Sequence, residues 1–116
     1  MTQPPYGKED AYSAIPFAET QAAAGNLPSI TFVSGGVHSV VKGQNTGYGD
    51  AAVWQKDVPS IEASIIKAKD SVKFYALDAG LKKRGVVDSE IIEGISKLNI
   101  DDLMNRILES EVTLVF

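Results

Sequence analysis

Apolar side chains recur at helical spacing in several parts of the chain. Residues 8–24 carry such a stripe, and Pro16 inside it predicts a kink or break, because proline removes a backbone hydrogen bond. The most regular stripe fills residues 100–108, directly after Asn99, a residue type that caps helices well. Shorter helices are predicted over residues 37–42, over residues 78–83 and after residue 57.

Residue types that commonly begin or end helices predict further helix boundaries. Asp57 or Ser60 can cap the helix after residue 57, and Pro59 is acceptable there only in the first turn. Asp78 is expected to cap the helix over 78–83, and Gly85 to end it.

Short β-branched and aromatic runs, bounded by turn residues, predict strands at 30–33, 72–77 and 112–116. Residues 86–95 follow no clear period, and residues 43–57 are predicted to form a long loop. Strands that alternate with helices indicate an α/β fold. We therefore predict one domain over residues 1–116, with three α/β/α layers around a mainly parallel, Rossmann-like sheet of four to five strands.

The amino-acid composition restricts the range of possible chemistry more than the range of possible folds. The chain has 116 residues, 44% of them hydrophobic and 22% charged, with a formal net charge of −4. That balance gives no support to binding of nucleic acid or an anionic membrane. No cysteine is present, so disulfides, thiolate metal sites, thiol nucleophiles and persulfides on this chain are excluded. The lack of a long apolar run or a signal-peptide pattern leads us to expect a cytoplasmic protein.

The carboxyl ends of parallel strands form the edge where ligands usually bind in such folds. Gly35 and Gly36 follow the first predicted strand, where free backbone amides could hold a small anion, although a tight turn explains two glycines about equally well. His38 comes next and could act as a general base, but no nucleophile accompanies it. An enzyme using His38 is therefore the last of our hypotheses.

Other clusters have simpler explanations. Asp88, Glu90 and Glu93 lack the glycine-punctuated loop of a calcium site and are interpreted as a solvated face, so no metal and no cofactor is expected. The basic residues 82–84 suit the carboxyl end of a helix. Aromatic side chains in loops often anchor interfaces, which makes Tyr48 and Trp54 candidate contact residues.

Several segments, taken in order, resemble the DsrE/DsrF/DsrH family of sulfur-relay proteins, which includes the TusB, TusC and TusD subunits. Residues 5–11 begin with Pro5-Tyr6-Gly7, similar to the family's proline-aromatic-glycine turn. Residues 30–44 and 72–86 are similar to its second strand and to the segment that carries the relay cysteine. The sequence Glu93-Gly94-Ile95, the last helix and the apolar end complete the pattern.

Two departures from the family pattern stand out. Where relay-competent members carry cysteine, this chain has Tyr75-Ala76-Leu77-Asp78, with Leu77 the most plausible equivalent position, as in the cysteine-free DsrH or TusB type. Family members also begin with an apolar strand, whereas only Met1-Thr2-Gln3 precede the turn here. Either the start lies upstream of Met1, or the sheet has a lost or shortened strand.

The resemblance implies a non-catalytic subunit or accessory of a sulfur-transfer complex. Its expected partners are further copies of this chain, as a dimer, trimer or hexamer, or cysteine-bearing DsrE or DsrF homologues. The alternative is a module that binds a small anion or sulfur compound at the strand ends. The candidate ligand residues are Tyr6, Gly7, Gly35, Gly36, His38, Leu77 and Asp78.

Overall fold

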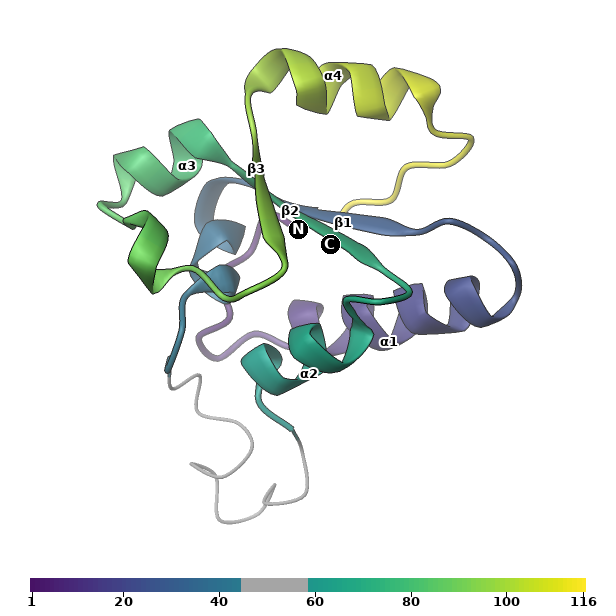
Figure 1. Ribbon diagram of the computed structural model, residues 1–116, viewed down its shortest axis with the longest axis horizontal. Coiled ribbons are helices and arrows are strands. Elements are labelled where there is room, and N and C mark those ends of the chain that lie inside the picture. The colour runs from purple at the N-terminus through teal and green to yellow at the C-terminus, as the bar shows by residue number, and fades with distance from the viewer. Residues whose placement is uncertain (45–58) are drawn as a thin grey trace.

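The computed structural model describes residues 1–44 and 59–116, and its three strands alternate with helices (Figure 1). The strands are β1 (Ser29–Phe32), β2 (Lys73–Leu77) and β3 (Ile95–Leu98). The α-helices are α1 (Asp10–Ala23), α2 (Ile61–Ala68), α3 (Asp78–Lys83) and α4 (Ile100–Glu109), and the short 3₁₀ helices are η1 (Ser34–Val40) and η3 (Asp88–Glu90).

The strands form one parallel sheet in the order β1-β2-β3, with Ile30 opposite Phe74 and Phe74 opposite Ile95. Helices α1 and α2 lie on one face of the sheet and α4 on the other (Figure 1). The α/β fold and its three layers are therefore as predicted. The strand number is lower than predicted, at three among the described residues.

The core lies between the sheet and the layer formed by α1, α2 and η1. Phe32 and Phe74 project from neighbouring strands into this layer, with their rings stacked at 6.4 Å, and both are almost fully buried. Ile15 and Ile65 cover them from the helices. Because successive side chains of a strand point to opposite faces, Tyr75 and Leu77 face the α4 side and are only half-buried.

The first two residues occupy a fourth row of the sheet beside β1. Met1 donates its amino group to the Thr31 carbonyl at 3.0 Å and accepts from the Val33 amide at 2.8 Å, which is parallel pairing. Thr2 in turn donates its amide to the Phe116 carbonyl at 2.8 Å. This row is short, and the prediction of a strand over 112–116 was wrong, because in the described chain only Phe116 of that segment reaches a backbone partner.

A kink or break was predicted at Pro16, and the break is ruled out, because α1 is one continuous helix from Asp10 to Ala23. The Thr20 hydroxyl donates to the Pro16 carbonyl at 3.0 Å, one turn away. The buried stripe of α1, which includes Ala11 and Ile15, packs against the sheet, and this packing outweighs the cost of the missing hydrogen bond.

The structure confirms the predicted helix ends at Ser60 and Gly85 and corrects the one at Asp78. The Ser60 hydroxyl accepts from the Ala63 amide at 3.1 Å, and Pro59 precedes this cap instead of entering the first turn. The alternative cap, Asp57, lies outside the described residues. Asp78 was predicted to cap α3, but Leu77 holds that position and the Asp78 carboxylate bonds elsewhere. Gly85 follows α3 with φ +67°, as expected of a glycine that ends a helix.

No residue of helix α4 is buried, and a side chain caps its N-terminus. The Asn99 side chain accepts from the Asp102 amide at 2.8 Å. We expect Asn99→Ala to lower helix stability by about 1 kcal/mol, and amide hydrogen exchange to speed up mainly within α4. Asn105→Ala, the same substitution at an exposed position in the middle of the helix, is the matched control. Equal exchange rates in the Asn99 variant and the wild type would contradict this role.

Candidate functional site

The carboxyl ends of β1 and β2 meet at one edge of the sheet, where η1 and α3 begin. Leu77 is the last residue of β2 and remains half-buried. Gly80 lets α3 pack closely on η1, since a Cβ atom at Gly80 would lie 3.0 Å from Val37. Of the candidate ligand residues, Gly35, Gly36, Leu77 and Asp78 therefore belong to two adjoining turns.

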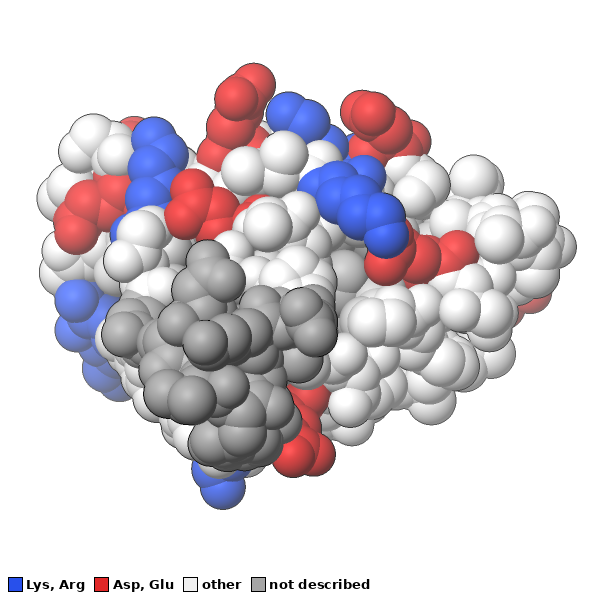
Figure 2. Space-filling model, turned by 90° about the horizontal axis from the view of Figure 1, so that it is seen from below, with Lys and Arg blue, Asp and Glu red and all other residues white. Residues whose placement is uncertain are grey.

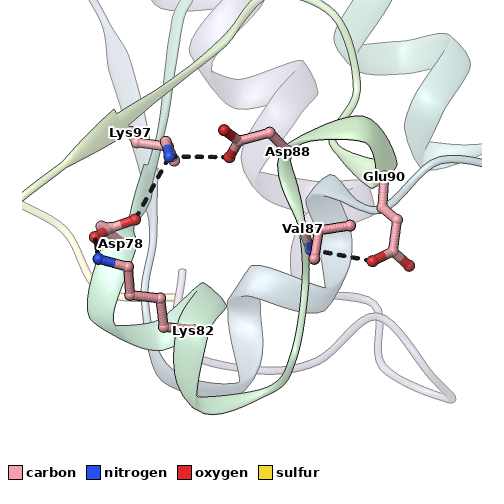
Figure 3. A network of polar contacts seen from close by, with 6 residues as sticks. All are labelled: Asp78, Lys82, Val87, Asp88, Glu90 and Lys97. Carbon is pink, nitrogen blue, oxygen red and sulfur yellow. Dashed lines mark hydrogen bonds and ion pairs between the residues drawn. The ribbon is translucent and has the colours of Figure 1, made fainter.

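Asp78 is the centre of a charged network at this edge (Figure 3). Its carboxylate contacts the Lys82 ammonium at 2.7 Å and the Lys97 ammonium at 3.7 Å. Lys97 also contacts the Asp88 carboxylate at 2.9 Å, so that one lysine links α3 to η3. The network has two carboxylates and two ammonium groups, so its formal charges cancel.

The network shifts the ionisation of two of its members. The hydrogen bond from Lys82 is the main cause that lowers the pKa of Asp78, against a smaller desolvation effect. The hydrogen bond to Asp88 is the main cause that raises the pKa of Lys97. The lowered pKa of Asp78 stabilises the folded protein at pH values above the ordinary pKa of aspartate. This contribution to stability is lost as the pH falls through the folded-state pKa of Asp78.

Removing the Lys82 charge tests this assignment. We expect Lys82→Met to raise the pKa of Asp78 toward its ordinary value, so that the carboxyl carbon titrates at higher pH in an NMR titration. Lys83→Met, which removes the adjacent charge without touching the network, is the control. The same Asp78 midpoint in the Lys82 variant and the wild type would rule out the contact as the cause.

The glycine pair serves close packing. A Cβ atom at Gly36 would lie 2.3 Å from the Met1 carbonyl oxygen, and one at Gly35 would lie 3.2 Å from that of Thr2. The Gly36 amide is also occupied, because it donates to the Thr2 carbonyl at 3.0 Å and to the Val33 carbonyl at 2.9 Å. Of the two explanations that the sequence left open, the tight approach of two backbones accounts for the geometry.

Tyr6 and His38 form a separate contact. Their ring centroids lie 5.8 Å apart at an interplanar angle of 53°, with Tyr6 about half exposed. Gly7, next to Tyr6, adopts φ +64° in the turn before α1. Among residues 1–44 and 59–116, no ion pair joins His38 to a carboxylate. The structure thus pairs this histidine with the Tyr6 ring.

The remaining sequence candidates divide in two groups. Tyr48 and Trp54 lie outside the described residues. The three carboxylates once considered for a cation have separate partners, since Asp88 contacts Lys97, the Glu90 carboxylate accepts from the Val87 amide at 3.0 Å (Figure 3), and Glu93 contacts Lys69 at 3.7 Å. Residues 1–44 and 59–116 contain no cluster of three potential metal ligands.

Two residues of the strand edge escaped the sequence analysis. Lys97 links the network but belongs to β3, a strand that was not predicted. Ser34 begins η1 with φ +51°, a left-handed conformation that is uncommon for a residue other than glycine. Neither Lys97 nor Ser34 has a local sequence signal. The position of Lys97 depends on the pairing of β3 with β2, and Ser34 depends on the close passage of Gly80 beside its backbone.

Among the described residues on the face formed by α1 and α2, acidic and basic side chains are interspersed, with a broad uncharged area on the right of Figure 2. Among the described helices, none is both long and apolar enough to cross a membrane.

These observations define the class of protein: a three-layer α/β domain with a parallel sheet and no cysteine at the strand edge. Residues 1–116 match the DsrE/DsrF-like family, and the chain belongs to that family. This confirms the resemblance drawn from the sequence.

Its relatives include two uncharacterised archaeal proteins. A Methanopyrus kandleri protein is 29% identical over 117 residues, covering all of this chain and 89% of the relative. A Methanocaldococcus jannaschii protein is 29% identical over 120 residues, covering all of this chain and 95% of the relative. The crystal structure of the ychN protein from E. coli matches with a TM-score of 0.78 over the whole of both chains at 19% identity, which supports the fold.

Proposed function

We propose that this chain is a non-catalytic accessory or subunit of a cytoplasmic sulfur-transfer complex. One observation carries the proposal: a DsrE/DsrF-like chain ends its second strand with Leu77 where the resemblance places the relay cysteine, and it has no cysteine elsewhere. A persulfide needs a thiol sulfur, so the chain cannot hold the transferred atom itself. Its role is to complete or regulate an assembly in which another protein carries the sulfur.

The geometry of the strand edge supports an accessory role over catalysis. Leucine at position 77 offers no nucleophile, and the charged groups beside it are engaged with one another. His38, the only histidine, contacts the Tyr6 ring. General acid-base catalysis would need a positioned proton donor or acceptor at the reacting atom. We therefore expect no turnover by this chain alone.

The same geometry weakens the alternative of small-anion binding. Lys82 and Lys97 already face carboxylates, and the Gly36 amide already has two acceptors. An anion would have to displace these partners. We accordingly expect sulfite, thiosulfate and phosphate to leave the melting temperature unchanged, whereas a rise that grows with ligand concentration would favour the alternative.

Complex formation is the first test of the accessory role. The chain is mixed with a cysteine-bearing DsrE or DsrF homologue from the same organism and examined by native mass spectrometry. We expect a complex of defined stoichiometry that persists at micromolar concentration. Only separate species, over the full concentration range, would contradict the proposal.

A cysteine variant tests the orientation of the strand edge in that complex. In Leu77→Cys the new thiol stands at the proposed relay position, and we expect it to receive the outer sulfur of the partner's persulfide while the partner's thiol is regenerated. Ala79→Cys is the matched control, because Ala79 is exposed and lies in α3, two residues after Leu77. Equal labelling of the two variants, read by intact mass, would show that position 77 has no privileged access.

A further inference from the structure

The outer edge of β3 is open to pairing with another strand. β2 occupies one side of β3, and no strand within residues 1–44 and 59–116 pairs with the other side. The Ile95 amide donates to the Ile92 carbonyl at 3.4 Å, so it points away from β2. Because backbone direction alternates from one residue to the next, the amide and carbonyl of Lys97 point to the same open side. An open edge of this kind is a template for an added strand.

The charged side chain of β3 does not cover this edge. Edge strands are commonly protected by a lysine, and Lys97 is the lysine of β3. Its ammonium contacts Asp88 at 2.9 Å and Asp78 at 3.7 Å, as Figure 3 shows. These two carboxylates hold the lysine against η3 and α3, and the outward backbone groups of β3 stay accessible.

Both faces of the sheet are hollowed beside β3. On the face of η3, a groove of about 290 Å³ has Ile91 and Ile95 in its wall. On the face of α4, a second hollow of about 240 Å³ has Tyr75 and Ser96 in its wall. Gly94, at the start of β3, borders both. Side chains of an added strand alternate between the two faces, so apolar ones fit the Ile91 groove and small polar ones fit the opposite hollow.

The segment before β3 determines the charge of a fitting partner. Residues 88–93 contain three carboxylates and no basic side chain. Lys97 offsets Asp88, whereas Glu90 has no ion pair among the described residues, and Glu93 has only a long one, to Lys69 at 3.7 Å. The Glu93 side chain is 87% exposed and borders the groove. The groove therefore presents excess negative charge beside the apolar Ile95.

We propose that the outer edge of β3 binds an extended basic segment of a different protein as an added strand. An apolar residue of that segment lies opposite Ile95, and basic residues two positions away on either side face the carboxylates. Main-chain hydrogen bonds supply the affinity, and the groove with its charges selects the sequence. Because β3 has four residues, the complex is expected to be weak and reversible. The inference goes beyond the proposed sulfur-transfer role and stands without it.

A labelled probe peptide tests the proposal by fluorescence anisotropy with the full chain. The probe has the sequence Thr-Lys-Thr-Val-Thr-Lys-Thr with blocked ends, which places lysine, valine and lysine on one face of a strand and threonine on the other. We expect saturable binding at concentrations below about 1 mM. The same peptide with glutamate in place of both lysines should bind at least about tenfold more weakly, because the groove is acidic.

Methylation of peptide amides distinguishes an added strand from non-specific charge attraction. Two forms of the probe are made, with N-methyl groups either on the lysine and valine amides or on the threonine amides between them. Only one of the two sets can face β3, so one form should lose at least about tenfold in affinity and the other should bind like the parent. Amide hydrogen exchange at Lys97 should also slow when the parent peptide is bound.

Charge reversal in the chain locates the binding site. Glu93→Lys should weaken binding of the lysine peptide about fivefold or more and strengthen binding of the glutamate peptide. Glu109→Lys, the same change at an exposed position of α4, is the matched control, and circular dichroism confirms that both variants are folded. Absence of binding by the lysine peptide, or equal binding of the two methylated forms, would overturn the proposal. So would tighter binding of a peptide with the sequence of residues 112–116, because the edge would then suit a second copy of this chain.

Discussion

Replacing Gly36 with alanine is expected to lower the free energy of unfolding by about 3 kcal/mol and the melting temperature by about 10 °C. The added Cβ would lie 2.3 Å from the Met1 carbonyl oxygen and 2.8 Å from its carbon, distances that no folded protein tolerates. Both atoms belong to backbone, so a side-chain rotation cannot relieve the clash. The Met1-Thr2 row must move away from β1.

That movement breaks several hydrogen bonds at once, which is why the expected effect exceeds that of an ordinary surface substitution. The Val33 amide would lose the Met1 carbonyl, and the Gly36 amide would lose that of Thr2. Gly35→Ala is the comparison variant, because its Cβ would lie 3.1 Å from the Pro4 ring and 3.2 Å from the Thr2 carbonyl oxygen, so a shift of a few tenths of an ångström relieves the contact and a smaller loss of about 1 kcal/mol is expected. Equal melting temperatures for the two variants would show that the Met1 row is not held as described.

Phe32→Ala is expected to destabilise the protein by about 3–5 kcal/mol, a large share of the total for a domain of this size. Phe32 is fully buried and stacks on Phe74, so its removal leaves a cavity between the sheet and the helices. Urea denaturation followed by circular dichroism measures the loss.

Phe17→Ala serves as the control, because the Phe17 side chain is 44% exposed and contacts the Phe116 ring at 6.3 Å near the surface. Its loss is expected to be about 1 kcal/mol. A comparable loss in both variants would contradict the assignment of the core to the α1 and α2 side of the sheet.

Elements with strong local signals could be predicted from sequence. The strands β1 and β2 are β-branched and aromatic runs between turn residues, and their type and position came out within one residue of the structure. Asn99 was predicted as a cap, and Ser60 as one of two possible caps, because a cap depends only on the next few residues.

Elements that depend on distant partners could not be predicted in the same way. β3 is only four residues long and lies at the edge of the sheet, with Ser96 and Lys97 exposed, so its pattern has little hydrophobic periodicity. The network at Asp78 could not be predicted for the same reason, because Lys97 belongs to β3 and reaches Asp78 only through this strand.

The same limit applies to the candidate site. A glycine pair after a strand fits an anion cradle and a close backbone approach equally well in sequence. The deciding atoms belong to Met1 and Thr2, which are distant from Gly36 along the chain. The family, by contrast, could be identified from the order of its segments, since that order does not depend on a cysteine.

The accessory role makes a direct prediction about the speed of sulfur transfer. The measurement is the rate at which a cysteine-bearing DsrE or DsrF homologue from the same organism passes persulfide sulfur to its acceptor, with and without this chain at equimolar concentration. We expect the rate to change several-fold when the chain is present, and all protein-bound sulfur to be found on the partner and the acceptor. An unchanged rate, with no complex formed, would contradict it.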